Sequence, residues 1–245
     1  MTISWDPDRY EALPLPHEEW GQRVVNKMEL NGNETLVDAG CGSGRDAALA
    51  LSRLPRGSII GLDSSPTMRA ACERRFIGSA QVKICAADLM ETWPVETESV
   101  DAVMSVAAFH WLGRPERAWE QVARVLKPGG RVRIDAGGEG NVERLLAAVD
   151  AVSAGDLLPL WHYAGVDETI GHLRCVGLTP IEVNLRIAPA VFQTDVIYLD
   201  YLKNVVLHSL SDEQRTQVAH MMGDRCVDYV RLEVFAAKPH SAVSK

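Results

Sequence analysis

The stretch LVDAGCGSGRD, residues 36–46, passes from an apolar run through a carboxylate into three glycines that alternate with other residues. A strand-like run, TLVDA (35–39), leads into the glycines, and an amphipathic run, DAALALSRL (46–54), follows them. Glycine lets the backbone adopt positive φ and lets a ligand approach without a Cβ in its way, while the start of a helix presents free N–H groups. We therefore predict a strand–turn–helix unit whose turn faces a ligand, as the first βα turn of a parallel sheet does.

Residues 35–136 repeat this alternation of short β-branched runs and longer helical patterns. The helical run at 115–130, for example, begins with Pro115, places Trp119 and Val122 on one face, and stops at Pro-Gly-Gly. This rhythm predicts βαβ units and an α/β fold, a Rossmann-like three-layer sandwich with a mostly parallel sheet and helices on both faces. The predicted strands are 35–39, 58–63, 82–88, 99–108 and 131–136.

Helical patterns also flank this central block. An amphipathic run at 17–30 predicts a helix that covers the sheet before the first strand. After Gly137 the pattern is less regular, and we expect it to complete the sheet and to supply helical lid elements over its carboxyl edge. The expected helices are 141–152, 167–178, 193–208 and 211–228, and the expected strands are 181–187 and 228–239. We predict a single domain, 1–245, divided into a cover helix (1–34), a cofactor-binding core (35–136) and a remainder with the substrate cap (137–245).

The composition excludes several classes of function. Among 245 residues, 25 basic and 33 acidic side chains give a formal net charge of −8 without a dense Lys/Arg block, so we expect neither nucleic-acid nor membrane binding. No apolar run approaches the roughly 20 residues that span a bilayer. Five cysteines without a C-x-x-C pair argue against a disulfide framework and a zinc site, and we expect no metal. The N-terminal region lacks the pattern of a signal peptide, so we expect a reducing, cytoplasmic location.

The three glycines of the turn, Gly40, Gly42 and Gly44, do not match the dinucleotide fingerprint G-x-G-x-x-G. That spacing requires a glycine where this chain has Arg45. Asp38 supports the same exclusion, because a carboxylate at the turn would repel a pyrophosphate. The expected ligand therefore carries positive charge or hydrogen-bond donors.

Two further aspartates close the next two predicted strands. Asp63 is placed to accept two hydrogen bonds from a ribose diol. Asp88 is placed to accept from an exocyclic amine such as that of adenine, although an aspartate before a helix also serves as an N-cap. Acids at three successive strand ends suit a nucleoside with a cationic appendage, and S-adenosylmethionine (SAM) has this chemistry.

The motifs that carry these residues resemble the class I SAM-dependent methyltransferases. In chain order they are VDAGCGSGR, GLDSS, AADL, SVDAVMSVAAFHW and LKPGGRV, within residues 35–136. More narrowly, AAFHW, GGEGN, PLWHY and DYVRLEV are similar to the trans-aconitate and malonyl-carrier-protein methyltransferases. The resemblance implies a seven-stranded sheet with an antiparallel last strand, SAM as cofactor, and methyl transfer to a small acid or a related acceptor, free or carrier-bound.

The resemblance also implies roles for individual residues around the cofactor. The residues implied to contact SAM are, for its methionine moiety, Asp38, Gly40, Gly42, Gly44 and Ala107; for its ribose, Asp63 and Ser64; and for its adenine, Asp88 and Leu89.

His110 and Trp111 follow the fourth predicted strand at the edge of the cleft, where the resemblance places the acceptor. His110 could act as a general base, but a carboxylate acceptor is already ionised near neutral pH, so alignment for in-line displacement would suffice. Arg231 could clamp a substrate carboxylate, or it could lie on a solvated strand face. The expected substrate contacts, each with ordinary packing as its alternative, are Tyr10, Trp20, Trp161, His162, Tyr229 and Arg231.

Covalent chemistry is not expected. Cys41 has no histidine nearby in the sequence, and the chain has no G-x-S-x-G elbow. The leading interpretation is O-methylation of a carboxylate or hydroxyl group on a small molecule. The alternatives are C- or N-methylation of a natural-product intermediate, and a SAM-binding protein that transfers no methyl group. The chain would act as a monomer or a homodimer.

Overall fold

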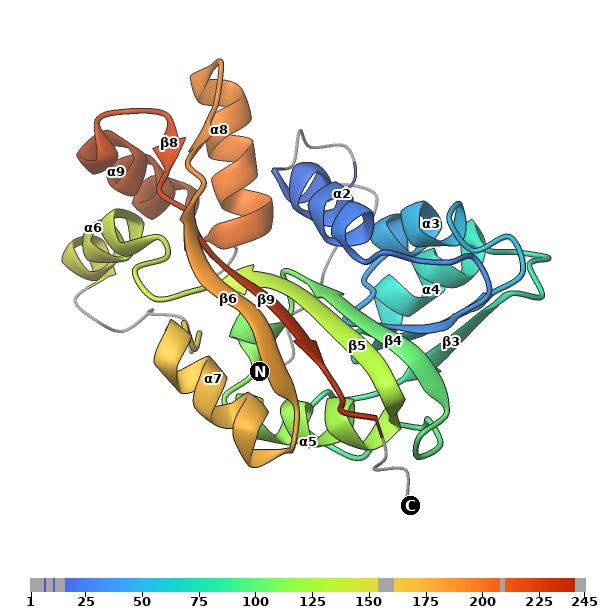
Figure 1. Ribbon diagram of the computed structural model, residues 1–245. Helices are drawn as coiled ribbons and strands as arrows, with labels where there is room; N and C mark the ends of the chain where they lie inside the picture. The colour runs from blue at the N-terminus through green and yellow to red at the C-terminus, as the bar shows by residue number, and fades with distance from the viewer. Residues whose placement is uncertain (1–6, 8–10, 12–15, 154–160, 208–209, 241–245) are drawn as a thin grey trace, which may run out of the picture.

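The computed structural model describes residues 7, 11, 16–153, 161–207 and 210–240. Its centre is a seven-stranded sheet in the order β3-β2-β1-β4-β5-β9-β6 (Figure 1). Only β9 is reversed, being antiparallel to both β5 and β6. This topology confirms the predicted Rossmann-like sheet with an antiparallel last strand. The strands are β1 (Thr35–Ala39), β2 (Ser58–Asp63), β3 (Val82–Ala86), β4 (Val100–Val106), β5 (Leu126–Gly137), β6 (Thr179–Ile187) and β9 (Val230–Ala237).

Successive residues of the central strands enter two separate cores, one on each face of the sheet. On β1, Leu36 belongs to one core and Val37 to the other, because side chains alternate along a strand. The first face is covered by α2 (His17–Lys27) and α3 (Arg45–Leu51), with α4 (Pro66–Arg75) beside α3 (Figure 1). The second is covered by α5 (Pro115–Val125) and α7 (Val166–Cys175). None of the helices in the described ranges is long and apolar enough to cross a membrane.

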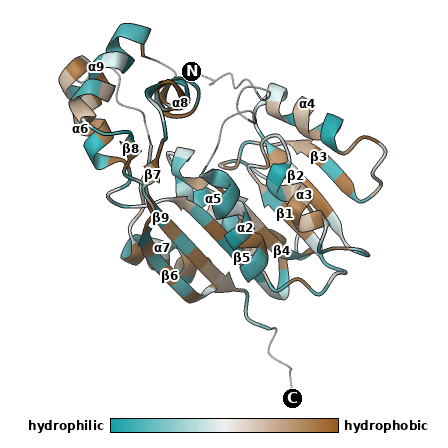
Figure 2. Ribbon diagram, turned by 90° about the horizontal axis from the view of Figure 1, so that it is seen from above, coloured by the Kyte–Doolittle hydropathy of each residue, from teal (hydrophilic) through white to brown (hydrophobic). Residues whose placement is uncertain are grey.

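A separate group of helices lies at the end of the sheet where β5 and β6 finish (Figures 1 and 2). Its apolar side chains join the core on the α2 face. A short antiparallel pair of strands accompanies these helices. The elements of this group, here called the cap, are α6 (Glu143–Ser153), β7 (Ala190–Val191), α8 (Asp195–Tyr201), the π-helical segment η2 (Leu202–Val206), α9 (Asp212–Met222) and β8 (Cys226–Val227).

Several boundaries shift by one to three residues from the prediction, and two differ more. The helix expected over 211–228 ends at Met222, because Gly223 adopts φ +68° and turns the chain out of the helix. The residues beyond it form β8, which is too short for a periodic signal. β5 begins at Leu126 rather than near 131, with an irregularity in its pairing with β4 before Arg131.

Candidate active site

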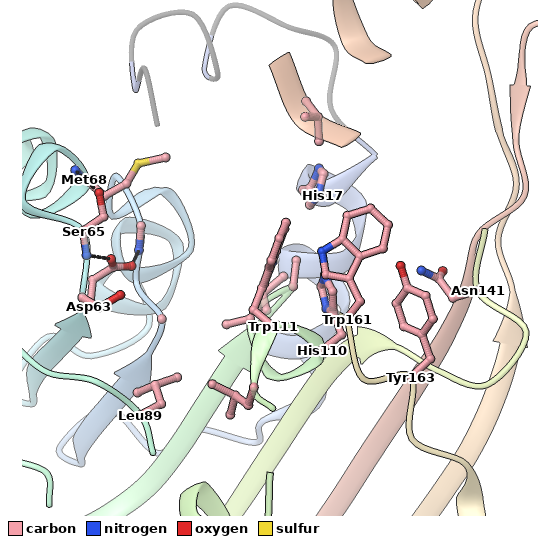
Figure 3. A pocket seen from close by; sticks show the side chains of 18 of the residues that line it. His17, Asp63, Ser65, Met68, Leu89, His110, Trp111, Asn141, Trp161 and Tyr163 are labelled. Carbon is pink, nitrogen blue, oxygen red and sulfur yellow. Dashed lines mark hydrogen bonds between the residues drawn. The ribbon is translucent and has the colours of Figure 1, made fainter. Parts of the chain in front are cut away.

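A cavity of about 600 Å³ lies at the carboxyl ends of β1, β2 and β4 (Figure 3). The turns after these strands form one end of it, which we call the glycine end. The other end, which we call the aromatic end, is formed by the 3-10 helix η1 (Phe109–Trp111), by Trp161 and Tyr163, by the start of β9 and by the start of α2. The glycine end includes Gly40, Gly42, Asp63, Ser64, Asp88 and Ala107, and the aromatic end includes His17, His110, Trp111, Trp161, Tyr229 and Arg231.

Gly40 and Gly42 form the wall of the glycine end, with φ values of +83° and +53°. A Cβ on Gly40 would lie 2.4 Å from the Cβ of Ala108, whereas a Cβ on Gly42 would meet no atom within 4 Å. Gly44 does not line the cavity, since its Cβ would meet the Sγ of Cys72 in α4 at 2.6 Å. Two of the three glycines thus border the ligand space, and the third allows α3 to approach α4.

Asp63 ends β2 with its carboxylate at the cavity wall (Figure 3). One oxygen, Oδ2, accepts a hydrogen bond from the N–H of Gly42 at 2.9 Å, and Oδ1 accepts one from the N–H of Ser65 at 2.8 Å. Burial raises the pKa of this carboxyl, and the two N–H groups and the charge of Arg69 oppose the rise. Because each oxygen can accept a second hydrogen bond, the oriented carboxylate suits a vicinal diol.

Asp38 lies beneath the glycine turn and is 2% exposed, and it is not among the residues that line the cavity. Its Oδ2 accepts no hydrogen bond from any residue that the structure describes. Burial, with the nearby Asp46 carboxyl as a further cause, raises the pKa of Asp38 well above its usual value. A cation that reached this carboxyl would favour its ionised form.

Asp88 lies exposed at the rim of the glycine end. Its Oδ1 accepts a hydrogen bond from the N–H of Met90 at 2.9 Å, which closes a turn, and no helix begins there, so Asp88 is not an N-cap. Leu89 and Met68 add apolar surface to the same wall. The rim therefore combines an acceptor with an apolar surface on which a planar ring could lie.

Ala107 follows β4 with φ +55°, a left-handed conformation that is uncommon for residues other than glycine. Its N–H donates to the carbonyl of Asp135 at 2.7 Å, which holds the strained residue in place. Ala107 lines the cavity between its two ends. Backbone strain of this kind concentrates at functional sites.

His110 lies at the centre of the aromatic end (Figure 3). Its Nδ1 accepts a hydrogen bond from the N–H of Gly137 at 3.2 Å. Burial, together with the positive charge of Arg231, lowers the pKa of His110 to about 3. The ring is therefore neutral near neutral pH, and because Nδ1 is an acceptor, Nε2 carries the proton. His110 can donate a hydrogen bond but cannot take a proton through Nε2.

Aromatic rings form the wall beside His110. The ring centroids of Trp111 and Trp161 are 5.4 Å apart, and those of Trp161 and Tyr163 are 5.8 Å apart. The indole N–H of Trp161 is buried and has no hydrogen-bond partner among the described residues. This part of the cavity wall is thus mainly apolar, with single hydrogen-bond donors set in it.

His162 does not line the cavity, although it lies between two residues that do. Its Nε2 lies 2.6 Å from an oxygen of Glu168, which also lies 3.3 Å from Nε2 of His172. His162 thus connects the segment to α7. In the described part of the chain, no group of three or more His, Cys, Asp or Glu side chains could hold a metal ion.

Arg231 lines the aromatic end and is 1% exposed. Its Nε donates to Asp135 Oδ1 at 2.7 Å, and its guanidinium lies 3.7 Å from the ring centroid of Trp20. No described residue accepts a hydrogen bond from its Nη1. Trp20 does not line the cavity, so its role in this structure is to pack against Arg231 and, at 5.0 Å between ring centroids, Tyr229.

The structure brings most of the predicted site residues together. Of the others, Tyr10 lies outside the described residues, and Asp38, Gly44, Trp20 and His162 do not line the cavity. The lining residues that were not predicted include the polar side chains of His17, Ser65 and Asn141. Asn141 is held by the N–H of Val230, which donates to its Oδ1 at 2.9 Å. Such long-range contacts leave no local signal in the sequence.

Residues 37–134 match a family model described as a methyltransferase domain. This segment includes most of β1, all of β2, β3 and β4, and the turns that form the glycine end.

The relatives that match by sequence include two methyltransferases named for acids. Trans-aconitate 2-methyltransferase of Acidovorax sp. (strain JS42) is 29% identical over 126 residues, which are 51% of this chain and 47% of that protein. Malonyl-[acyl-carrier protein] O-methyltransferase of Methylococcus capsulatus is 26% identical over 223 residues, covering 90% of this chain and 79% of that protein. The match therefore spans about half the length of the first relative and most of the second.

Among solved structures, the YcgJ protein of Bacillus subtilis superposes with a TM-score of 0.71 at 16% identity, covering 92% of this chain and all of that one. At this identity the likeness concerns the fold.

Proposed function

Because residues 37–134 match the family model of a methyltransferase domain, we propose that the protein transfers a methyl group from SAM to a carboxylate oxygen of a small acid. The observation that carries the choice of acceptor is the state of His110. Its Nδ1 accepts a hydrogen bond from the N–H of Gly137 and its pKa is about 3, so this histidine, beside the expected acceptor, is a neutral donor.

The residues of the glycine end fit SAM. Asp63 offers two oriented oxygens for the ribose diol, and the open space at Gly42 leaves room for the ligand. No lysine or arginine lines this end in the described part of the chain, which disfavours a pyrophosphate. The unpartnered Oδ2 of buried Asp38 suits the cationic methionine end.

SAM, when bound, supplies a methyl group on a positively charged sulfur. Asp63 would hold the ribose, Asp88 and Leu89 would hold the adenine, and the strained backbone at Ala107 would border the methionine moiety. Ser64 lies at the wall beside Asp63 and would contribute to the same subsite. These residues bind and orient; none of them needs to exchange a proton.

The aromatic end would hold the acceptor acid by its oxygens. Nε2 of His110, the indole N–H of Trp161 and Nη1 of Arg231 are three donors that no described residue satisfies. Donors of this kind stabilise a carboxylate, most strongly when one of them is charged. The rings of Trp111 and Tyr163 would exclude water from the reacting oxygen.

Transfer to carbon or nitrogen would ordinarily require a base beside the acceptor. His17 and His110 are the histidines of the aromatic end, and the pKa of each is lowered, chiefly by burial. No carboxylate is among the residues that line this end within the described ranges. An acceptor that is already ionised avoids this requirement. The two relatives are named for trans-aconitate and malonyl-[acyl-carrier protein], both of which carry a carboxylate.

The proposal is tested by incubating the protein with SAM and a panel of small carboxylic acids, each paired with its carboxamide. We expect release of S-adenosylhomocysteine with at least one acid and none with the matched amide, which has no ionised oxygen. Release with amines or carbon acids alone would contradict the proposal. Binding of SAM without release for any acceptor would favour a protein that transfers no methyl group.

A further inference from the structure

Large apolar side chains that are exposed to solvent gather on β6. Within the described ranges, seven such residues are exposed, and three of them lie on this strand. Ile181 is 57% exposed, Leu185 is 37% exposed and Ile187 is 81% exposed. Single apolar residues scattered over a surface are ordinary, but three on one strand form a patch of the kind that marks an interaction site.

β6 is also the last strand of the sheet, and its outer edge is open (Figure 2). Its pairing is with β9 alone, and in the described part of the chain no backbone hydrogen bond joins it to a third segment. From Glu182 to Ile187 the register with β9 is regular. An open edge carries unpaired N–H and C=O groups that another strand can bond.

The sequence of β6 is complementary to itself in the antiparallel direction. With Asn184 opposite Asn184 of a second copy, Val183 would face Leu185 and Ile181 would face Ile187. On the other face of the strand, Glu182 would face Arg186, twice per pair of chains. On either side of Asn184, each apolar residue would thus face an apolar residue, and each charged residue would face one of opposite charge.

We infer that β6 pairs with β6 of a second copy of this chain, about a two-fold axis at Asn184, to form a continuous sheet across two protomers. The contact is isologous, because each strand offers the same surface to the other. Pro180 lacks an N–H, and the register shifts between Pro180 and Glu182. Pro180 therefore limits the pairing at one end, and Ile181, which lies within the irregularity, is the last residue of the paired segment.

Backbone hydrogen bonds and the apolar pairs carry the affinity, and the charges set the register. Glu182 already lies 3.4 Å from Nζ of Lys27, and Arg186 bonds Glu233 at 2.5 Å. Both side chains face α2 and keep part of their surface exposed, at 37% for Glu182 and 24% for Arg186. Pairs of this kind contribute more to specificity than to affinity.

The pairing acts one strand away from the aromatic end. Arg186 lies opposite Arg231 in the β6–β9 register, and Ile187 lies opposite Val230. A second copy would give β6 hydrogen bonds along both of its edges, which would hold β9 and its arginine more firmly.

The first test is sedimentation velocity over a micromolar concentration series. We expect the wild type to dimerise, and the Ile181→Lys/Ile187→Lys variant to dissociate at least about tenfold more readily. The matched control is Ile77→Lys, since Ile77 is 88% exposed and lies in the α4–β3 connection, away from β6. A wild type that stays monomeric, leaving the edge to a different partner, would overturn the proposal, and so would a lysine variant that dimerises like the wild type.

A second test fixes the register without relying on loss alone. The Lys/Lys variant and an Ile181→Glu/Ile187→Glu variant should each be monomeric, because like charges would face each other across the axis. Their equimolar mixture should form a one-to-one heterodimer, since a lysine would then face a glutamate in both of the 181–187 pairs. Recovery of the dimer in the mixture also shows that both variants are folded. A mixture that stays monomeric would contradict this pairing.

Discussion

The Nδ1 atom of His110 accepts a hydrogen bond from the backbone N–H of Gly137, 27 residues away along the chain, at 3.2 Å. This contact fixes the tautomer, so that the only ring proton lies on Nε2. Burial and the nearby guanidinium of Arg231 keep the ring from taking a second proton until the pH falls to about 3. The chemistry at the aromatic end therefore depends on donation rather than on proton removal.

The rate of methyl transfer should not follow the titration of His110. Its folded-state pKa of about 3 leaves the ring neutral at every higher pH, so kcat/KM should show no ascending limb near the usual histidine value of 6.5. The measurement is the pH profile of kcat/KM for the wild type and for His110→Gln, whose amide N–H can replace Nε2–H.

His110→Ala removes the donor and should lower kcat/KM by about 10- to 100-fold, as expected for a hydrogen bond to a charged group. His110→Gln should retain more activity than the alanine variant. An ascending limb near pH 6.5 in the wild type that disappears in His110→Gln would identify His110 as a base and contradict this interpretation.

Asp63→Ala should weaken SAM binding by about 1–3 kcal/mol, because two charge-assisted hydrogen bonds to the ribose would be lost. Isothermal titration calorimetry on the folded variant measures this loss. Asp101→Asn is the matched control: its carboxylate accepts a hydrogen bond from the N–H of Thr35, which begins β1 at the amino end of the strand, opposite the cavity, so SAM affinity should not change. Equal affinity in Asp63→Ala and the wild type would remove the ribose assignment.

Arg231→Lys should raise KM for the acid by about tenfold or more while leaving SAM affinity unchanged. Lysine keeps the charge beside buried Asp135 but loses the planar fork and the stacking on Trp20. Steady-state kinetics separates the two effects. The control is Arg23→Lys, since Arg23 pairs with Glu233 and does not line the cavity. If both variants behave alike, Arg231 has no specific part in holding the acceptor.

Glu34 should stabilise the fold near neutral pH and lose this effect in acid. Burial alone would raise its pKa, but the N–H groups of Asn31 and Gly32 and the guanidinium of Arg131 lower it to about 2. Because the folded-state pKa lies below the unfolded value of 4.5, the contribution is complete above about pH 4.5 and declines as the pH falls toward 2.

Glu34→Gln should therefore reduce the free energy of unfolding by about 2 kcal/mol at pH 7, and by less at pH 3. Urea denaturation at the two pH values checks this. A difference between wild type and variant that is the same at both pH values would contradict the assigned role.

The local part of the fold could be predicted from the sequence because its signals are contiguous. β1 and β2 have the predicted bounds, since each is a short and largely apolar run with an aspartate at or next to its end, followed by a glycine turn or a helix cap. Short elements gave no such signal: β7 and β8 have two residues each and pair across 35 or more positions.

The site was predictable where it follows directly from strand ends, and not where it depends on packing between distant segments. Asp63 and Ala107 lie at the cavity because β2 and β4 end there. Trp20 was expected at the substrate, but the fold places it behind Arg231, on the far side from the ligand space. The residue pattern of α2 does not indicate whether Trp20 faces the cavity or packs against Arg231.

In the proposed reaction the methyl group of SAM is transferred to a carboxylate oxygen. The most direct measurement supplies SAM labelled with ¹³C at the methyl group, together with the acid that releases most S-adenosylhomocysteine, and locates the label in the product by NMR. We predict one labelled methyl ester for each S-adenosylhomocysteine formed. A label bonded to carbon or nitrogen, or S-adenosylhomocysteine without a methylated acid, would contradict this reaction.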